Sequence, residues 1–549
     1  MLAAPASLWA AREHVCDVAV IGGGTGGCAA ALAALRNGMR VVMTEETDWV
    51  GGQLTSQLVP PDEHPWIESF GSTQLYRSYR NAVRDYYRAH YRLTADARAR
   101  LLLNPGDGNV SRLAHEPRVS LAVLENLLAP YVSGGQLTVL LDHRPVRADV
   151  NGDRVRAVAL KSTRSGAERT ISAPYFIDAT EQGDLLPLTK TEYVTGFEAR
   201  SRTGEPHAPE KAQPANIQSF TVCFAIDYVD GQDHTIDKPG EYAFWRDYVP
   251  AMKPAWPGKL LSWHMSNPQT LQVRNVSFDP TEGTSKPGGP LNLFLYRRIA
   301  NKRNHVAGAF QGDMSLINWP QNDYWLGNLH EVSDAEAARH LARAKQLSLS
   351  LLYWMQTEAP RPDGGQGWKG LRLRHDAAGT EDGLAKYPYI RESRRIEAEF
   401  TVVEEHVGAD ARMKKTGKAR DDVAAEPFAD SVGVGSYRID LHPSSGGDNY
   451  IDISSLPFQI PLGALIPKRM ENLLPASKNL GVTHITNGCY RLHPVEWNIG
   501  ESAGALAAHA VKTGHRPRKI RNDAGLLAGF QQSLTAQGVE LAWPRISPR

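Results

Sequence analysis

Apolar and polar residues in the first fifty positions follow a strand, helix, strand order. Residues 17–21 (DVAVI) are apolar and β-branched, which predicts a buried strand of a parallel sheet. Residues 28–36 (CAAALAALR) predict an alanine-rich helix whose small side chains allow a close approach to that sheet. Residues 39–44 (MRVVMT) predict a second strand, with Glu45 at its carboxyl end. This order is typical of an α/β fold with a parallel sheet.

Glycines fill the turn between the first strand and the helix. Gly22, Gly24 and Gly27 form a GxGxxG pattern. In dinucleotide-binding turns the first glycine permits the tight turn, the second lets the backbone approach a pyrophosphate, and the third allows close helix–strand packing. The helix N-terminus offers N–H groups to the phosphates, and Glu45 can accept hydrogen bonds from a ribose. Glu46 is the alternative acceptor. The combination predicts a dinucleotide site, and the alternative is a structural turn.

The rest of the chain shows both strand and helix patterns. Residues 117–131 have the apolar spacing of a helix. Residues 136–172 alternate around Asn151-Gly152-Asp153, which predicts a hairpin. A strand is expected at 220–227 and a long amphipathic helix at 332–357. Two segments rich in charged or small residues, 199–216 and 409–426, are expected to be exposed loops.

Composition narrows the class of protein. The chain has 549 residues, 42% of them hydrophobic, and a formal net charge of +1. This charge gives no general attraction to nucleic acid. Cys16, Cys28, Cys223 and Cys489 form no CxxC or zinc-ligand spacing, so we expect no metal site. No apolar run is long enough for a membrane span, and the N-terminus lacks a secretory signal, so we expect a cytoplasmic protein.

Three further segments carry a resemblance to a known family. Gly51-Gly52-Gln53 follows the acid after a short spacer. Residues 175–184 (YFIDATEQGD) are a strand followed by a small-residue turn at Ala179-Thr180, with Glu181 where glycine is usual. Residues 483–504 precede and enter an alanine-rich helix, with Pro494 suited to its first turn. Together these segments resemble the FAD-dependent oxidoreductases of the glutathione-reductase-type fold, over most of the chain.

The resemblance implies FAD as the cofactor and a discontinuous α/β architecture. We expect a Rossmann-like FAD-binding domain at 1–195 and 460–549, with an inserted α+β substrate domain at 196–459 built on a mixed or antiparallel sheet. The isoalloxazine ring would lie at the N-terminus of the helix that begins near Pro494. The residues expected to bind the cofactor are Gly22, Gly24, Thr25, Gly27, Glu45, Glu46, Gly52, Gln53, Ala179, Thr180, Asn498 and Ile499.

A flavin oxidoreductase needs one acid or base near its working pH, which favours histidine. His493 precedes the flavin-facing helix and has Glu496 three residues on, so Glu496 could orient it. His484, His442 and His64 are alternatives. Arg391 could hold a substrate carboxylate or stabilise reduced flavin. The competing interpretation of each residue is structural: a helix-start turn for His493 and a paired strand charge for Arg391.

Three functions are compatible with these residues. The first is a dehydrogenase or oxidase that moves a hydride from a polar small molecule to flavin N5, with oxygen, a quinone or a carrier as final acceptor. The second is a monooxygenase or reductase that uses NAD(P)H, although the chain has no second GxGxxG domain to hold that donor. The third is a non-catalytic flavin-binding protein. The sequence also allows a homo-oligomer.

Overall fold

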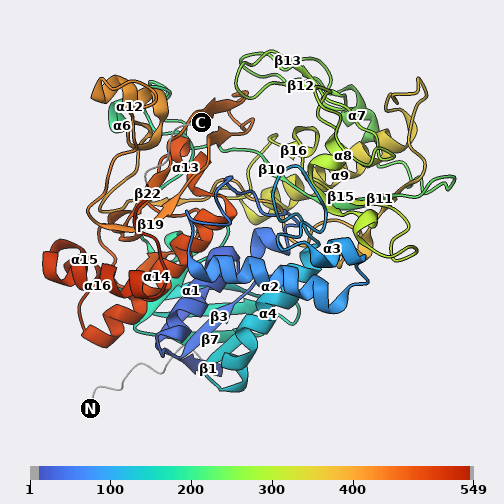
Figure 1. Cartoon of the computed structure of the whole chain (residues 1–549). Coiled ribbons are helices and arrows are strands. Elements are labelled where there is room, and N and C mark those ends of the chain that lie inside the picture. Colours follow the sequence, from blue (N-terminus) through green and yellow to red (C-terminus); the bar gives the residue numbers. More distant parts are fainter. Residues whose placement is uncertain (1–11, 545–549) are drawn as a thin grey trace.

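The computed structural model describes residues 12–544, built around a parallel sheet (Figure 1). The five strands follow the order β23-β8-β2-β3-β4. They are β2 (Val18–Ile21), β3 (Val41–Thr44), β4 (Leu137–Leu140), β8 (Tyr175–Asp178) and β23 (Leu473–Pro475). Every residue of β2, β3 and β8 is buried, because helices pack against one face of the sheet and strands from residues 154–172 pack against the other. The strands predicted near 17–21 and 39–44 are confirmed.

Helices from both ends of the chain cover this sheet. They are α1 (Thr25–Arg36), α2 (Gln74–His90), α4 (Pro117–Ser133) and α14 (His493–Thr513). In Figure 1 the red helix α14 lies beside the blue helix α1. The two helices approach backbone to backbone, since a methyl group added at Gly500 would lie 2.0 Å from the Gly26 carbonyl oxygen. One added at Gly504 would lie 2.1 Å from the carbonyl oxygen of Ala30. Only glycine permits this contact.

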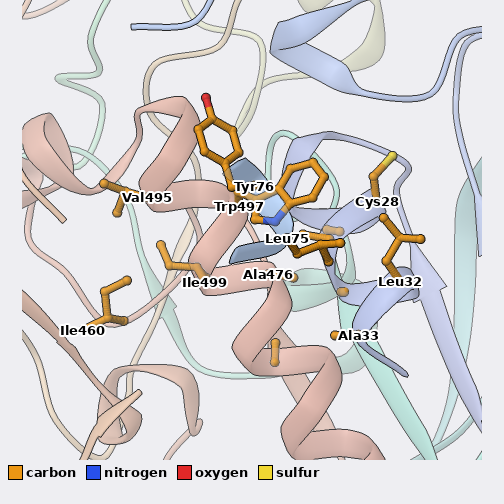
Figure 2. Close-up of a cluster of buried hydrophobic side chains, with 14 of the residues drawn as sticks. Cys28, Leu32, Ala33, Leu75, Tyr76, Ile460, Ala476, Val495, Trp497 and Ile499 are labelled. Carbon is orange, nitrogen blue, oxygen red and sulfur yellow. The ribbon is translucent and has the colours of Figure 1, made fainter. Parts of the chain in front are cut away.

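Aromatic side chains close the core beside this crossing. Figure 2 shows Trp497 of α14 close to Tyr76 of α2, with Cys28 and Leu32 of α1 nearby. The ring of Trp497 lies 5.6 Å from that of Tyr76 and stacks 5.5 Å from that of Tyr79. This buried cluster joins segments that are more than 400 residues apart in the sequence.

Two further four-stranded sheets flank the core. The first, β1-β7-β6-β5, contains the predicted hairpin, in which Asn151 pairs with Arg154. The second, β14-β15-β11-β17, is antiparallel and packs with a cluster of buried aromatic residues. Their strands are β1 (Arg12–Val15), β5 (His143–Asn151), β6 (Arg154–Ser162), β7 (Glu168–Ser172), β11 (Phe224–Tyr228), β14 (Arg298–Ala300), β15 (Met314–Ile317) and β17 (Leu371–Leu373).

Short elements complete the described chain. Two-stranded pairs are formed by β10 with β16, β12 with β13, β18 with β9, β19 with β22, and β20 with β21. These strands are β9 (Tyr193–Val194), β10 (Phe220–Thr221), β12 (His264–Ser266), β13 (Val273–Asn275), β16 (Asp323–Tyr324), β18 (Arg395–Ile396), β19 (Ser431–Gly435), β20 (Ile439–Leu441), β21 (Ile451–Ile453) and β22 (Phe458–Pro461). The other helices are α3 (Ala95–Ala99), α5 (Leu185–Thr189), α6 (Arg200–Thr203), α7 (Tyr242–Asp247), α8 (Leu293–Tyr296), α9 (Asp334–Thr357), α10 (His375–Ala378), α11 (Glu404–Val407), α12 (Ala409–Thr416), α13 (His484–Tyr490), α15 (Pro517–Asn522) and α16 (Ala524–Ala536).

The structure differs from the sequence expectations in two segments. The predicted loop at 409–426 contains α12, whose residues Ala409, Ala411 and Arg412 are buried, and the Arg412 guanidinium pairs with Glu426. The single strand expected at 220–227 is divided into β10 and β11, which pair in different sheets. Within residues 12–544, no helix has the length and apolar character needed to cross a bilayer.

We predict that Gly500→Ala destabilises the protein by about 1–3 kcal/mol, because the added methyl group forces α14 away from α1. Gly529→Ala is the matched control. Gly529 lies on α16, where an added methyl group meets nothing within 4 Å. That substitution should stabilise the helix by up to about 1 kcal/mol. Thermal unfolding followed by circular dichroism measures both effects, and equal melting temperatures would contradict the prediction.

Candidate functional site

A cavity opens at the carboxyl edge of the parallel sheet, where chain order reverses on either side of β2. Open α/β sheets bind ligands at such switch points. The lining residues, which define the sheet-edge cavity, are Gly22, Gly24, Thr44, Glu45, Glu46, Gly52, Ser56, His143, Pro145, Ala179, Thr180, Glu181, Asp184 and Tyr387. The cavity therefore brings together seven of the predicted cofactor-binding residues.

The glycine turn has the geometry that its sequence predicts. Gly22 has a φ of +102°, and a Cβ there would lie 2.3 Å from the Ala179 carbonyl oxygen. A Cβ at Gly27 would lie 2.2 Å from the carbonyl oxygen of Gly22. The Gly23 N–H donates to Glu45 Oε2 at 3.1 Å. The turn thus fixes the Glu45 carboxyl group at the end of β3.

Burial raises the pKa of the Glu45 carboxyl group to about 8, although hydrogen bonds from Thr47 oppose the change. Burial also raises the pKa of Glu46 to about 7, with Asp184 adding to the effect. Both residues line the sheet-edge cavity, so Glu46 keeps its place as the alternative partner of a ribose.

Several polar groups beside the glycine turn have no partner in the described chain. No side chain caps the N-terminus of α1. Glu181 Oε1, Gln53 Oε1 and both terminal atoms of the Gln57 side chain are buried without hydrogen-bond partners. Glu181 Oε1 would lie 2.7 Å from a Cβ at Gly24 and 2.6 Å from one at Gly52. An anionic carboxylate therefore lies against both bare glycines.

A buried lysine connects this carboxylate to α14. Lys478 Nζ lies 2.6 Å from Glu181 Oε2 and 3.2 Å from Glu496 Oε2. Burial opposes the charge of Lys478, but the two carboxylates hold its pKa above the ordinary value. Glu496 also accepts hydrogen bonds from Gln53 Nε2 at 2.6 Å and from the Gly26 N–H at 3.3 Å. Glu496 thus contacts the glycine turn, and no hydrogen bond of its side chain to His493 occurs in the described chain.

A second cavity, the arginine pocket, adjoins this region. Gln53 links the two, because its Nε2 donates to the carbonyl oxygen of Arg491 at 3.2 Å. The residues that define the arginine pocket are Asp62, Met265, Pro268, Arg274, Leu291, Leu293, Tyr296, Arg297, Asn318, Trp319, Pro320, Tyr389, Arg391, Tyr437, Arg438, Asp440, His442, Tyr450, Asp452 and Arg491.

His442 and Asp323 form a hydrogen-bonded pair at this pocket. His442 follows β20, and its Nδ1 lies 2.6 Å from Asp323 Oδ2. Arg391 Nη2 donates to the other oxygen, Oδ1, at 2.9 Å. Burial opposes ionisation of Asp323, but the charges of Arg391 and His442 hold its pKa below the ordinary value. Asp440 lies 3.5 Å from His442 Nε2. The pair therefore has an ionised carboxylate behind an imidazole that lines the pocket.

The other candidate histidines are engaged within the fold. His493 Nδ1 accepts from the Asp62 N–H at 3.0 Å, and Nε2 lies 3.2 Å from the Val59 carbonyl oxygen. Burial lowers the pKa of His493 to about 3, so the ring is neutral. His484 Nδ1 lies 2.9 Å from Glu392, and the ring stacks on Phe197.

His64 packs against Trp66 and Trp543, with Nε2 2.9 Å from the carbonyl oxygen of Gly71. Neither His64, His484 nor His493 lines the arginine pocket.

Some predicted cofactor-binding residues lie elsewhere in this region. Thr25 Oγ1 donates to the Gly51 carbonyl oxygen at 2.9 Å and so holds the second glycine turn against α1. Asn498 Oδ1 accepts from the Val434 N–H at 3.1 Å, which ties α14 to β19. Ile499 is part of the buried core. Among the aromatic residues of the segment 318–325 (NWPQNDYW), Trp319 lines the arginine pocket, whereas Tyr324 and Trp325 belong to a buried cluster.

Sequence reasoning missed several of these residues. Asp323 lies beside Tyr324 and Trp325 in a loop rich in Pro, Asn and Gln, and a carboxylate at that place was the available signal. Arg491 lies two residues before His493 in a segment assigned to the cofactor. No sequence signal joins Arg297 or Lys478 to the site, because their partners are distant along the chain.

The sequence was compared with models of known protein families, and one of them matches nearly the whole chain. The sequence model of the FAD dependent oxidoreductases matches residues 17–534. The chain belongs to the FAD dependent oxidoreductase family. FAD is therefore its cofactor, and the resemblance stated from the sequence is confirmed. No curated protein matches the chain.

Solved structures of flavoproteins are similar over different parts of this oxidoreductase. A variant of E. coli quinol fumarate reductase is 10% identical, with 96% of this chain and 74% of that chain covered and a TM-score of 0.33. A geranylgeranyl bacteriochlorophyll reductase-like protein from Thermoplasma acidophilum is 11% identical, with 96% and 85% covered and a TM-score of 0.29. L-proline dehydrogenase from P. horikoshii is 18% identical, with 34% of this chain covered and a TM-score of 0.17. The match spans only 24% of that dehydrogenase.

The residues of the sheet-edge cavity fit FAD. Glu45 is an acceptor for ribose hydroxyls, and the uncapped N-terminus of α1 offers N–H groups to a diphosphate. The bare glycines Gly24 and Gly52 leave room for close backbone approach. The unpartnered Gln53 Oε1 and the unpartnered side-chain amide of Gln57 can form hydrogen bonds with the part of the cofactor beyond the diphosphate. The one misfit is the negative charge of Glu181.

We predict that Glu181→Gln strengthens FAD binding about tenfold, because it removes a negative charge close to the diphosphate and frees Lys478 to pair with it. FAD titration of the apoprotein, followed by calorimetry, measures the change. Glu336→Gln, on the exposed side of α9, is the control and should bind FAD as the wild type does. Unchanged or weaker binding by Glu181→Gln would contradict the prediction.

We predict that Glu45→Gln reduces the loss of apoprotein stability at alkaline pH. The pKa of Glu45 is raised from 4.5 to about 8 in the folded protein. The folded state therefore holds more protons than the unfolded state between these values, and its stability is lost as pH rises through that window. Glutamine removes this component, so the variant gains stability relative to wild type from pH 5 to 8, about the interval between the two pKa values. Parallel denaturant titrations measure this; a constant difference would refute it.

Proposed function

We propose that this FAD-dependent oxidoreductase is a dehydrogenase or oxidase that removes a hydride from a polar small molecule bound in the arginine pocket, with His442 as the base. The observation that carries the proposal is the His442–Asp323 pair, in which His442 lines a cavity adjoining the glycine turn and Asp323 lies buried behind it. When bound, FAD supplies the acceptor for the two electrons. Glu45, Gly24, Gly52 and the N-terminus of α1 would hold it.

Asp323 orients His442 for proton transfer. Its Oδ2 accepts the Nδ1–H of the ring, so Nε2 becomes the nitrogen that can take a proton from a substrate hydroxyl or amine. Arg391 holds Asp323 in place and ionised, which stabilises the imidazolium formed when Nε2 is protonated. Asp440 lies 3.5 Å from Nε2; burial opposes its ionisation, but His442 and Arg491 hold its pKa well below the ordinary value, so it stays ionised and also stabilises the imidazolium.

Arg391 has a supporting position in this arrangement. Its guanidinium is buried and also donates to the Ser219 carbonyl oxygen and to Thr221 Oγ1, each at 2.9 Å. It thus acts on the base through Asp323, and the proposal gives Arg391 a positioning role. Glu496 contacts the glycine turn and Lys478, so we assign it to the cofactor side of the site.

The domain division follows the same proposal. Pairing of β23 with β8 supports one glutathione-reductase-type FAD domain made of 1–195 and 460–549. The antiparallel sheet around β11 supports an inserted substrate domain at 196–459. His442, Asp323 and Arg391 all come from that insertion, whereas Asp62 and Arg491 come from the FAD side.

We predict that His442→Gln slows anaerobic reduction of the bound flavin by substrate about 10²- to 10⁴-fold, because the general base is lost. The flavin content should stay unchanged, since His442 lies outside the sheet-edge cavity. Asp323→Asn should also slow reduction, because the ring loses its carboxylate partner. His234→Gln, at a half-buried position that lines neither cavity, is the control. Stopped-flow absorbance of the flavin measures each rate, with sugars, amines and hydroxy acids as candidate substrates.

Three outcomes would contradict the proposal. Bleaching by NAD(P)H alone would favour the monooxygenase or reductase. An unchanged flavin spectrum with every candidate would favour a non-catalytic flavin-binding protein. Full activity of His442→Gln together with loss in His484→Gln or His493→Gln would place the base elsewhere.

A further inference from the structure

The arginine pocket has an excess of hydrogen-bond donors. The Nε atoms of Arg297, Arg391 and Arg491 are buried without acceptors. The same is true of Asn318 Nδ2 and Trp319 Nε1. All five side chains line the pocket, and those of Arg391 and Arg491 are only 1% and 3% exposed. Buried donors without acceptors are costly, so a ligand that accepts several hydrogen bonds would satisfy them.

The charges of the pocket leave one cation without a counter-charge. Arg297 pairs with Asp62 at 3.4 Å, Arg391 with Asp323 at 2.9 Å, and Arg491 with Asp440 at 3.1 Å. Arg438 pairs with Asp452 at the rim. Within residues 12–544, Arg274 has no ion pair or hydrogen bond to its guanidinium. A ligand with a single negative charge would balance the pocket.

Arg297 is the pocket arginine whose carboxylate partner is the most distant. Its ion pair with Asp62 is longer than those of Arg391 and Arg491. Burial raises the pKa of Asp62 to about 6, although the charge of Arg297 opposes the rise. Arg297 Nη1 also donates to the Asn318 carbonyl oxygen at 2.9 Å, so its 3.4 Å contact with Asp62 through Nη2 is the weaker of the two, whereas Arg391 has a 2.9 Å contact at each Nη atom. Arg297 and Arg274 are therefore the guanidinium groups most able to turn to a ligand.

The remaining walls are mainly aromatic and aliphatic. A flat or apolar body would pack against them, as rings do against rings in protein interiors. These wall residues are Tyr296, Trp319, Tyr389, Tyr437, Tyr450, Leu291, Leu293 and Met265.

We infer that the substrate is a monocarboxylic acid with a cyclic or apolar body, whose carboxylate binds Arg297 and Arg274. The inference rests on the proposed function in taking the arginine pocket as the substrate site. A planar guanidinium matches a carboxylate through paired hydrogen bonds. A single charge fits the one unbalanced cation, whereas a phosphate dianion would leave an excess negative charge in a buried site.

The test measures binding of benzoate, benzamide and inorganic phosphate to the FAD-loaded protein by calorimetry and by perturbation of the flavin absorbance. Benzamide has the shape of benzoate without its charge. We expect benzoate to bind at least about tenfold more tightly than benzamide. Arg274→Gln and Arg297→Lys should each weaken benzoate about tenfold and leave benzamide unchanged. Arg246→Gln, on an exposed pair with Glu358, is the control and should change neither.

Equal affinity for benzoate and benzamide would overturn the inference, as would tighter binding of phosphate or unchanged benzoate binding in both arginine variants. Thermal unfolding of each variant shows that it is folded. Because the readout is binding, the two proposals can fail separately. If benzoate binds but no carboxylic acid reduces the flavin, the proposed function is wrong and the inference about the ligand still holds. If uncharged substrates reduce the flavin in a reaction that requires His442, and benzoate does not bind, the inference about the ligand is wrong and the proposed function still holds.

Discussion

The contact between the backbones of α1 and α14 is the constraint on which the rest of the structure depends. Gly26 and Ala30 on one helix meet Gly500 and Gly504 on the other with no side chain between them. This close approach brings Glu496 within hydrogen-bond distance of the Gly26 N–H, so the C-terminal segment completes a site that the N-terminal segment begins. The same approach aligns β23 beside β8 and places Arg491 next to Gln53. A larger side chain at Gly500 or Gly504 would push α14 away from α1 and so disturb both cavities.

Charge is distributed differently in the two cavities that this contact joins. The sheet-edge cavity contains acids, and burial raises the pKa values of Glu45 and Glu46 because ionised carboxylates are poorly solvated there. The Glu181 carboxylate forms an ion pair with Lys478 at 2.6 Å. The arginine pocket contains cations in excess. In our proposals FAD occupies the sheet-edge cavity and a substrate with one negative charge occupies the arginine pocket.

The sequence predicted the elements around the cofactor better than those around the substrate. The GxGxxG turn, Glu45 and the helix starting near Pro494 are local patterns, and the structure has each of them within two residues. The segment at 409–426 was expected to be a loop because it is charged. The structure has α12 there instead, because a helix buries Ala409 and Ala411 and lets Arg412 pair with Glu426. Charge patterns within one segment do not reveal such partners.

By itself, the sequence determined the nucleotide-binding unit and the family, because a turn, its flanking strand and its helix are set by spacing within a few tens of residues. Tertiary structure alone decided which histidine has a carboxylate partner and an open pocket. His442 meets Asp323 across 119 positions, and Lys478 meets Glu181 across 297. His493 was the stronger candidate from its position before α14, but both of its ring nitrogens face backbone groups. Hydrogen bonds between distant segments depend on how the chain folds back on itself, and no local pattern encodes that geometry.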